Sequence, residues 1–468
     1  MIRSTFLTRS AAGIALALST VAVAGLASAP ALAAEKKPAA PKLSLSKPFM
    51  AVAAPLQKSI EAAKTRADVV AARTQVDATE AALRAAQGAA ARKAANDKNT
   101  AAVSALGNTL TAEKAQLEGA YAAIANQDDR LMAGNLALSL GQLAKDGTIL
   151  RRALSTMLES GKVAPAEQPK LNFYLGNLAF DAKDYATARS ALTAAVGGGY
   201  HDNDADALLA DAYILDKQVP QGLAMMRQQI EAGKASGKPA GQNVMRRALS
   251  VAYNNKLYSE AAFFSAALAE TYPSAINWNA AIAIARDLGK FQPQETLDLM
   301  RLMERTNSFL EERDYIEYIQ AADARRSPGE VLKVIGLGTS AGKLKAGDLF
   351  VAESRTIANG RLAADKATLP AFERDARSGN ATAATAMAAA DAFLSYEDFA
   401  KAAELYRIAE AKPGADKDRA NTRLGIAQLG LGQTAEARAS FAKVGGARKE
   451  MAQLWAIHAA SLVAKPAM

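Results

Sequence analysis

Two stretches decide the fold: Leu175–Val196, LGNLAFDAKDYATARSALTAAV, and Leu209–Ile230, LADAYILDKQVPQGLAMMRQQI. Matched small and apolar residues recur in them at a spacing of 34 residues: Leu175 and Leu209, Ala188 and Gly222, Leu192 and Met226. A fixed period of this length indicates a repeat architecture, in which each unit buries its apolar face against its neighbours.

These residues resemble tetratricopeptide repeats, a family whose unit is two antiparallel helices with small residues where the helices cross. The resemblance implies that Gly176 and Ala188 are the crossing contacts. It also implies the residues that fill the space between the helices: Leu175, Phe180, Tyr185 and Leu192. Further units of this kind follow at 249–273, 393–413 and 424–441, and the resemblance extends over residues 131–464.

The expected fold class is all-α, a right-handed α-solenoid of antiparallel helix pairs with an N-terminal helical hairpin. Alanine, the best helix former, dominates a composition that is 50% hydrophobic and 6% aromatic. β-Branched residues appear singly rather than in the alternating runs of strands. The expected parts are a signal peptide at 1–33, a flexible Lys/Pro/Ala-rich leader at 34–54, an Ala-rich hairpin at 55–126, a solenoid at 131–310, degenerate helical repeats at 311–380 and C-terminal repeats at 381–464.

Heptad spacing marks the hairpin at 55–126. One arm carries apolar or small residues seven apart at Val69, Val76, Leu83 and Ala90, and after a break at 88–100 the other carries Val103, Leu110, Leu117 and Ile124. A heptad repeat that continues over several turns favours a supercoiled seam, either between the two arms or with another subunit. Residues 348–378 fit the repeats worst, and we expect helix there that is out of register with them.

The N-terminus has the order of an export signal. Arg3 and Arg9 precede the uncharged run Ala11–Leu26, and small residues lead to expected cleavage after Ala33 or Ala34. The apolar run is short for a membrane anchor. The chain has no cysteine, which excludes disulfides and thiolate metal sites. We expect a periplasmic protein without a membrane span after cleavage.

The formal charge of the chain is +9, and residues 35–100 contain 12 Lys or Arg against 6 Asp or Glu. Such a segment suits weak contact with anionic lipid headgroups or acidic polymers. A solvated helix face explains it equally. We expect protein or peptide partners of the cell envelope and no binding to nucleic acid.

Candidate catalytic and metal-binding groups are few. His201 stands among Asp202, Asn203, Asp204 and Asp206, but the spacing matches no calcium loop, and an inter-repeat turn whose side chains cap the next helix explains it. Residues 336–343 resemble a phosphate loop, yet Leu337 replaces its first glycine and Leu344 its Ser or Thr. His458 belongs to the last helix, where we expect it to pack or to cap the helix. The sequence therefore predicts no enzyme, no catalytic residue, no cofactor and no metal.

The resemblance implies that the first helix of each unit lines a concave groove. Side-chain amides and apolar residues there suit peptides or partner helices. The candidate contact residues are Phe173, Asn177, Phe180, Asp181, Ala207, Asp211, Ile214, Leu215, Arg247, Val251, Asn254 and Asn255. The predicted function is a periplasmic scaffold or adaptor for envelope partners. Two alternatives stay open: a structural oligomer that coordinates envelope or outer-membrane assembly through the hairpin, and a helical accessory domain of a cell-wall enzyme.

Overall fold

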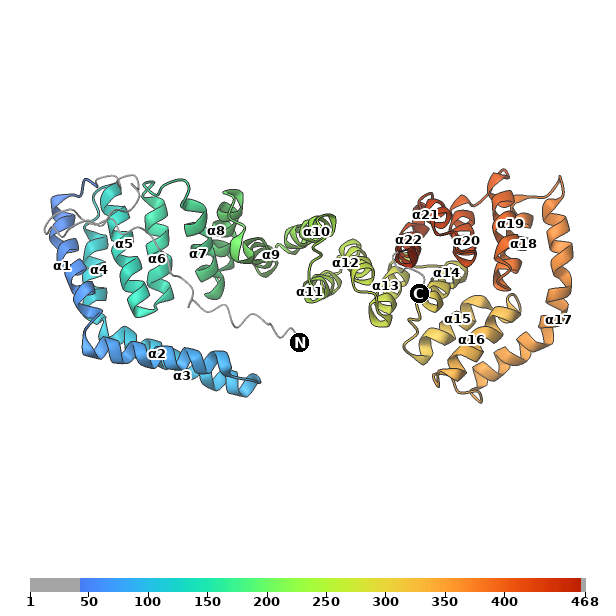
Figure 1. Ribbon diagram of the computed structural model, residues 1–468, viewed down its shortest axis with the longest axis horizontal. Coiled ribbons are helices and arrows are strands. Elements are labelled where there is room, and N and C mark those ends of the chain that lie inside the picture. The colour runs from blue at the N-terminus through green and yellow to red at the C-terminus, as the bar shows by residue number, and fades with distance from the viewer. Residues whose placement is uncertain (1–42, 464–468) are drawn as a thin grey trace. The chain divides into compact units, whose positions relative to one another are not determined.

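The computed structural model describes residues 43–463, which contain 22 α-helices, two short 3-10 helices and no strand (Figure 1). The predicted all-α class is therefore confirmed. The helices form two compact units that divide between Met225 and Met226, inside α10 (Val219–Ala235). The predicted signal peptide at 1–33 and residues 34–42 of the predicted leader lie outside the described residues.

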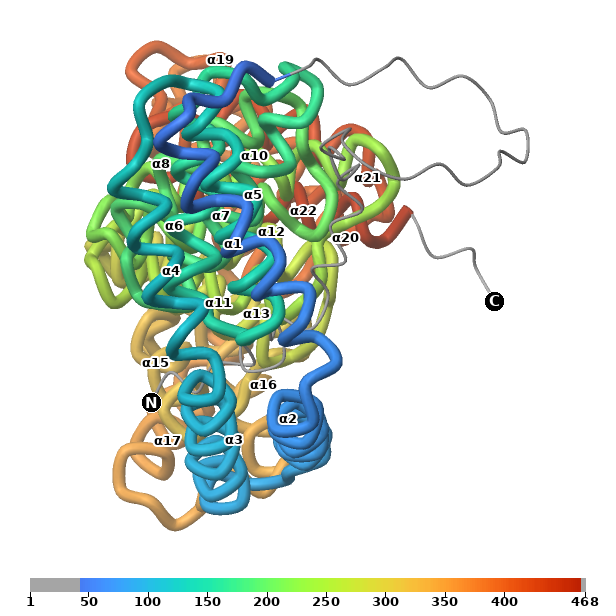
Figure 2. The backbone as a smooth tube through the Cα atoms, turned by 90° about the vertical axis from the view of Figure 1, so that its left-hand side faces the viewer, coloured from blue at the N-terminus to red at the C-terminus, as the bar shows by residue number. Residues whose placement is uncertain are grey.

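The N-terminal hairpin of the first unit consists of two helix pairs, one formed by its outer helices and one by its inner helices. α1 (Lys47–Ala63) packs against α4 (Thr111–Ala122), while α2 (Ala67–Ala85) and α3 (Ala89–Thr109) lie side by side and project as an arm (Figure 2). The heptad residues Val69 and Val76 are fully buried. At these two positions the seam therefore lies within one chain, where α2 packs against α3.

α1 begins at Lys47, so the prediction of a flexible leader is wrong for residues 47–54. The Ser46 hydroxyl accepts a hydrogen bond from the Phe49 amide (3.3 Å) and Pro48 occupies the first turn, where proline is tolerated. Phe49 starts a buried face that continues through Ala53 and Leu56 at helical spacing. The predicted break at 88–100 shrinks to residues 86–88, because the alanines after Gly88 extend α3.

Helix pairs fill the rest of the first unit: α5 (Gln127–Ala144) with α6 (Gly147–Glu159), and α7 (Gln168–Asp181) with α8 (Tyr185–Gly197), followed by α9 (Ala205–Leu215). Gly176 is the crossing point of α7 and α8. A Cβ on Gly176 would lie 2.6 Å from Leu192 Cγ and 3.2 Å from the Ala188 carbonyl oxygen. The predicted crossing contact of Gly176 with Ala188 is confirmed.

The second unit continues the pairs and interrupts them once. Residues 348–378, expected to be helical but out of register, form α17 (Leu349–Arg377), a single helix of 29 residues. The other helices are α11 (Gln242–Asn254), α12 (Tyr258–Thr271), α13 (Ala275–Gly289), α14 (Pro293–Arg305), α15 (Glu312–Ala322), α16 (Pro328–Ser340), α18 (Ala383–Ser395), α19 (Phe399–Ala411), α20 (Lys417–Gly430), α21 (Thr434–Phe441) and α22 (Lys449–Val463).

The second unit closes on itself. Its last helix, α22, packs against α12 and α13 near its beginning (Figure 1). One apolar core runs through it from Ala269 to Trp455. Within this core α20 is buried on all sides from Ala420 to Gln428. An open array would expose one face of such a helix, so the C-terminal repeats present no open concave groove along α20.

Candidate functional site

The predicted groove residues lie on three helices, α7, α9 and α11. α7 and α9 contact each other in the first unit, so the structure brings their residues together. α11 belongs to the second unit. The residues on α7 are Phe173, Asn177, Phe180 and Asp181; those on α9 are Ala207, Asp211, Ile214 and Leu215; and those on α11 and its C-terminal end are Arg247, Val251, Asn254 and Asn255.

Two of these residues belong to the core and present no surface to a ligand. Phe173 is 5% exposed and stacks on Tyr200, with ring centroids 4.8 Å apart. Asp211 is 3% exposed. Their burial contradicts the expected ligand contact, and for Phe173 the ring of Tyr200, in the chain before α9, provides part of the cover.

The exposed members lie on separate helices of the two units, and each unit presents its own. Leu215 is 43% exposed, and Asn254 and Asn255 are exposed at the end of α11. The Asn255 side-chain amide donates to the Val251 carbonyl at 2.8 Å. It therefore supports its own helix end. Ligand contact by the exposed and half-buried members stays a prediction.

A deeper site, which sequence reasoning missed, lies in the second unit. We call it the α12–α22 groove; it has a volume of about 600 Å³ and runs between these two helices, with α10, α13 and α21 at its edges. α12 and α22 each contribute one continuous stripe at helical spacing. The stripe on α12 is Ser259, Ala262, Phe263, Ala266, Ala267 and Glu270, and that on α22 is Lys449, Glu450, Gln453, Leu454, Ala456, Ile457 and Ala460.

Alanines and four larger side chains, Phe263, Gln453, Leu454 and Ile457, line the groove, and charged side chains border it. Arg227 of α10 lies over the Phe263 ring, 4.1 Å from its centroid, and pairs with Glu231 at 3.1 Å. Lys234 pairs with Glu270 at 2.6 Å. Arg438 and Lys449, both exposed, form no ion pair with another described residue.

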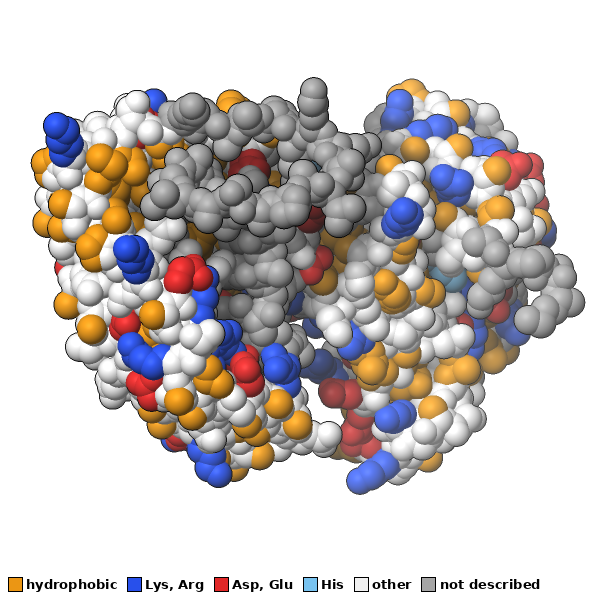
Figure 3. Space-filling view, turned by 60° about the vertical axis from the view of Figure 1, so that its left-hand side comes forward, with side chains coloured by type: hydrophobic (Ala, Val, Ile, Leu, Met, Phe, Trp, Pro, Cys, Tyr) orange, Lys and Arg blue, Asp and Glu red, His pale blue; other side chains and the backbone are white. Residues whose placement is uncertain are grey.

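Elsewhere the basic side chains are dispersed. On the face shown in Figure 3, Lys and Arg of the described residues lie singly among neutral and apolar side chains or beside Asp and Glu. In the arm, Lys93 pairs with Asp97 at 2.7 Å and Lys145 of α5 pairs with Asp77 at 2.7 Å. This distribution is that of solvated helix faces.

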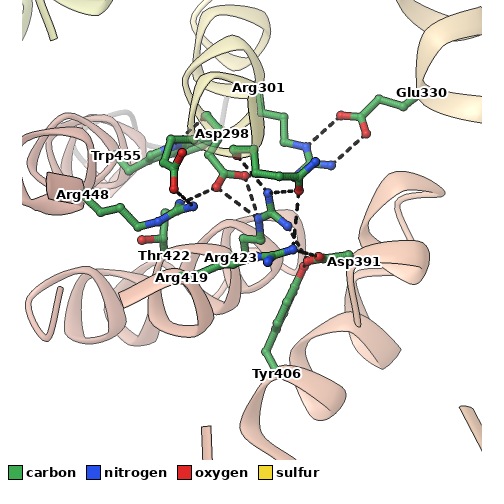
Figure 4. Close-up of polar contacts among 12 residues, drawn as sticks. Asp298, Arg301, Glu330, Asp391, Tyr406, Arg419, Thr422, Arg423, Arg448 and Trp455 are labelled. Atoms are coloured by element: carbon green, nitrogen blue, oxygen red, sulfur yellow. Dashed lines mark hydrogen bonds and ion pairs between the residues drawn. The ribbon is translucent and has the colours of Figure 1, made fainter. Parts of the chain in front are cut away.

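A buried ion cluster holds α22 in place as one wall of the groove. Its centre is Asp298 of α14, which is fully buried and accepts from three guanidinium groups (Figure 4). Arg423 of α20 donates to it at 3.0 Å, and Arg448, directly before α22, at 2.7 Å. Arg301, one turn along α14, donates at 3.1 Å. We call Asp298 with these three arginines the Asp298 cluster.

Further carboxylates balance the arginines of the Asp298 cluster. Arg301 makes two parallel hydrogen bonds to Glu330 of α16, both 2.8 Å long. Arg423 pairs with Asp391 of α18 at 2.6 Å. Because each of these buried guanidinium groups faces carboxylates, charge pairs inside an apolar core join α14, α16, α18, α20 and the short turn before α22.

The charges hold each other ionised. Burial by itself would raise the pKa of Asp298, but Arg423, Arg448 and Arg301 outweigh it and keep that pKa below its ordinary value. Burial opposes the charge of Arg301 as well, and Glu330 raises its pKa well above the usual value. The Trp455 indole of α22 donates to the Asp298 carbonyl at 3.1 Å. Arg448, directly before α22, and Trp455, within α22, therefore both bind Asp298 of α14, the first at its carboxylate and the second at its backbone carbonyl.

His458 packs against two tryptophans, as expected for a histidine of the last helix. Its ring lies 6.0 Å from that of Trp278 and 6.1 Å from that of Trp455, centroid to centroid. Burial, with a smaller contribution from Arg305, lowers the pKa of His458 to about 4. The ring is therefore neutral at physiological pH.

The remaining candidate motifs form turns and helix ends. His201 Nδ1 lies 2.9 Å from the carboxylate of Asp206 in an exposed turn. Residues 336–343 span the end of α16, with Gly342 in the left-handed region at φ +66°. That segment is a helix terminus, as its glycine content predicts.

Membrane-spanning character is absent from the described part of the chain, since no helix within 43–463 is both long and apolar enough to cross a bilayer.

Comparison with known proteins identifies no family. No family model matches the chain, and no curated protein matches it. Among solved structures, the Naa15/Naa10 complex bound to HypK-THB is similar at 14% sequence identity, over 87% of this chain and 70% of that chain, with a TM-score of 0.23. The TPR-like arrangement is accordingly assigned from the helix pairs and their glycine crossings in this chain.

Proposed function

We propose that this protein is a non-enzymatic scaffold of the bacterial periplasm that holds a protein partner in the α12–α22 groove. The observation that carries the proposal is the groove itself, bordered by two continuous helix stripes with alanines between charged edges. Contiguous apolar surface that is rimmed by polar groups is typical of protein interaction sites.

The size of the groove supports a macromolecular partner. Each stripe spans 11 residue steps, from Ser259 to Glu270 and from Lys449 to Ala460. At 1.5 Å per residue this is roughly 16 Å of helix surface. On α12 and α22 the charged side chains lie at one end of each stripe, Glu270 on α12 and Lys449 with Glu450 on α22, so a ligand that fills the groove would be elongated.

A site-specific photocrosslinker tests the proposal. We would place benzoylphenylalanine at Gln453, an exposed residue of the groove, and at Gln320, an exposed glutamine of α15 outside it, as the matched control. A partner captured from envelope extract at Gln453 and not at Gln320 would be identified, purified and titrated against the protein. Equal capture at both positions, or no binding by the purified partner, would contradict the proposal.

Export is the second part of the proposal and rests on the order of residues 1–33 in the sequence. A tag at the C-terminus would report the location of the chain after cell fractionation. We expect the tag in the periplasmic fraction for the full chain and in the cytoplasm when residues 2–33 are deleted. A cytoplasmic full chain would overturn the proposed location.

A further inference from the structure

We infer that the partner held in the α12–α22 groove is an α-helix with a face of small apolar residues and acidic side chains along its edges. The inference rests on the proposed function and names the chemistry of its partner. Three features of the groove carry it: the small residues of its walls, the few hydrogen-bonding side chains between its edges, and the charge of those edges.

The walls leave room for a helix to approach closely. Ala262 and Ala266 of α12 face the groove on one side, and Ala456 and Ala460 of α22 on the other. Helices whose contact residues are small can pack at the short end of the usual 8–10 Å range of axis separations. Three turns of a partner helix match the roughly 16 Å of each stripe.

The middle of the groove favours a helix over an extended peptide. Ala281 and Ala285 of α13 offer no hydrogen-bonding side chain there, and Ser265 already donates its hydroxyl to the Ala262 carbonyl at 3.0 Å, which leaves the single amide of Gln453. An extended peptide would bury backbone N–H and C=O groups without partners, at a cost of about 1–3 kcal/mol for each. A helix satisfies these groups internally.

The edges select an acidic partner. Four cations border the groove, Arg227, Lys234, Arg438 and Lys449, against the two carboxylates of Glu270 and Glu450. One of these carboxylates, Glu270, is already paired with Lys234. The two cations on the α21 and α22 side have no carboxylate partner among the described residues. Glutamates or aspartates on a bound helix would complete these pairs.

Synthetic peptides test the inference directly. The probe is a fluorescently labelled amphipathic peptide of about 16 residues, long enough to form a helix on binding, with an Ala/Leu face and glutamates on both flanks. Its two matched controls replace every glutamate with lysine, or two central alanines with proline. Fluorescence anisotropy with the purified full chain should show at least about tenfold tighter binding of the acidic peptide than of either control, weakening as salt is added.

Charge reversal on the protein ties the effect to the groove. In the double variant Arg438→Glu, Lys449→Glu the preference should invert towards the lysine peptide. The control variant Arg325→Glu, Lys345→Glu makes the same change at two exposed positions outside the groove and should keep the original preference. Inverted preference cannot come from misfolding, and circular dichroism of both variants should equal that of the parent chain.

The outcomes separate this inference from the proposed function. Equal binding of the lysine peptide would refute the acidic partner, and equal binding of the proline peptide would refute the helix. In either case, capture of a purified, binding partner at Gln453 would still support a scaffold with a partner of other chemistry. Failure of that crosslink together with failure of all three peptides would overturn both.

Discussion

Asp298 is a single carboxylate that accepts hydrogen bonds from three guanidinium groups, and its removal would take one negative charge away from all three. Arg423 and Arg448 lie within 3.0 Å and 2.7 Å of it, and both are buried. A buried ion pair adds little compared with a well-packed apolar replacement, but a buried charge that has lost its partner is expensive. The Asp298 cluster should therefore be sensitive to single substitutions that keep its shape and change its charge.

Asp298→Asn should lower the free energy of unfolding of the second unit by about 3–5 kcal/mol, because the amide removes the one carboxylate that three buried arginines share and leaves the cluster with an excess of buried positive charge. Urea denaturation followed by circular dichroism measures this. Asp375→Asn is the matched control, since Asp375 pairs with Arg374 at 3.2 Å on the exposed surface of α17. That change should stay below about 0.5 kcal/mol. Equal effects of the two substitutions would show that burial of the cluster contributes nothing specific.

His458 should make the protein less stable as the pH falls. Its pKa is about 4 in the folded chain. The unfolded chain, with an ordinary imidazole pKa near 6.5, binds the proton first, so the unfolding free energy should drop by about 2 kcal/mol between pH 7 and pH 5. Denaturation midpoints across this range would measure the slope.

The His458→Gln variant should lose most of that slope, whatever its effect on absolute stability. His201→Gln, at a histidine in an exposed turn, is the matched control and should keep the slope. An unchanged slope in His458→Gln would mean that the ring between the tryptophans is not held neutral.

Sequence reasoning located the packing of His458 and missed the Asp298 cluster for the same physical reason. A histidine within an apolar helix reveals its burial through its neighbours, Trp455 among them. Arg423 has no such local sign, because its partner Asp298 lies 125 residues earlier in the chain. A charged side chain can be buried only beside a partner of opposite charge. For Arg423 that partner is brought close by the fold, so the local sequence does not reveal it.

At the scale of helices, pair packing depends on glycines that permit close approach. Gly176→Ala would place a Cβ 2.6 Å from Leu192 Cγ, and Leu192 is fully buried. We expect an overpacking penalty of about 1–3 kcal/mol in the unfolding of the first unit. Gly119→Ala in α4 is the control: no atom lies within 4 Å of its Cβ position. It should be neutral or stabilise by about 0.5–1 kcal/mol. Equal destabilisation would contradict the crossing assignment.

Helix pairing was predictable where the repeat has a strong register and less so outside it. The 34-residue spacing from Leu175 to Leu209 located the crossing residues correctly. The start of α1 was missed because Pro48 resembles a leader residue, although proline fits the first turn of a helix. The α12–α22 groove was missed because its two walls are about 190 residues apart in sequence, and alanine stripes are common on any packed helix.

The whole chain should not assemble through its projecting arm. The heptad residues Val69 and Val76 are buried between α2 and α3 of one chain, which leaves no free seam for another subunit at these positions. Light scattering should give the same association state for the full chain and for a variant in which a Gly/Ser linker replaces residues 68–108. A mass that falls on removal of the arm would instead support the structural-oligomer alternative.

Closure of the second unit changes how this repeat protein can be made. In an open array, each repeat docks on the preceding one as it is synthesised, and truncation shortens the array one repeat at a time. Here Asp298 of α14 pairs with Arg448, which follows it by 150 residues, so this contact cannot form until nearly the whole unit has been synthesised. Such non-local contacts slow folding, because the entropy of closing the long intervening loop is lost before the contacts form. A chain that crosses a membrane before it folds would already contain α22 when folding of the second unit begins. A chain that lacks this last helix could not close the unit.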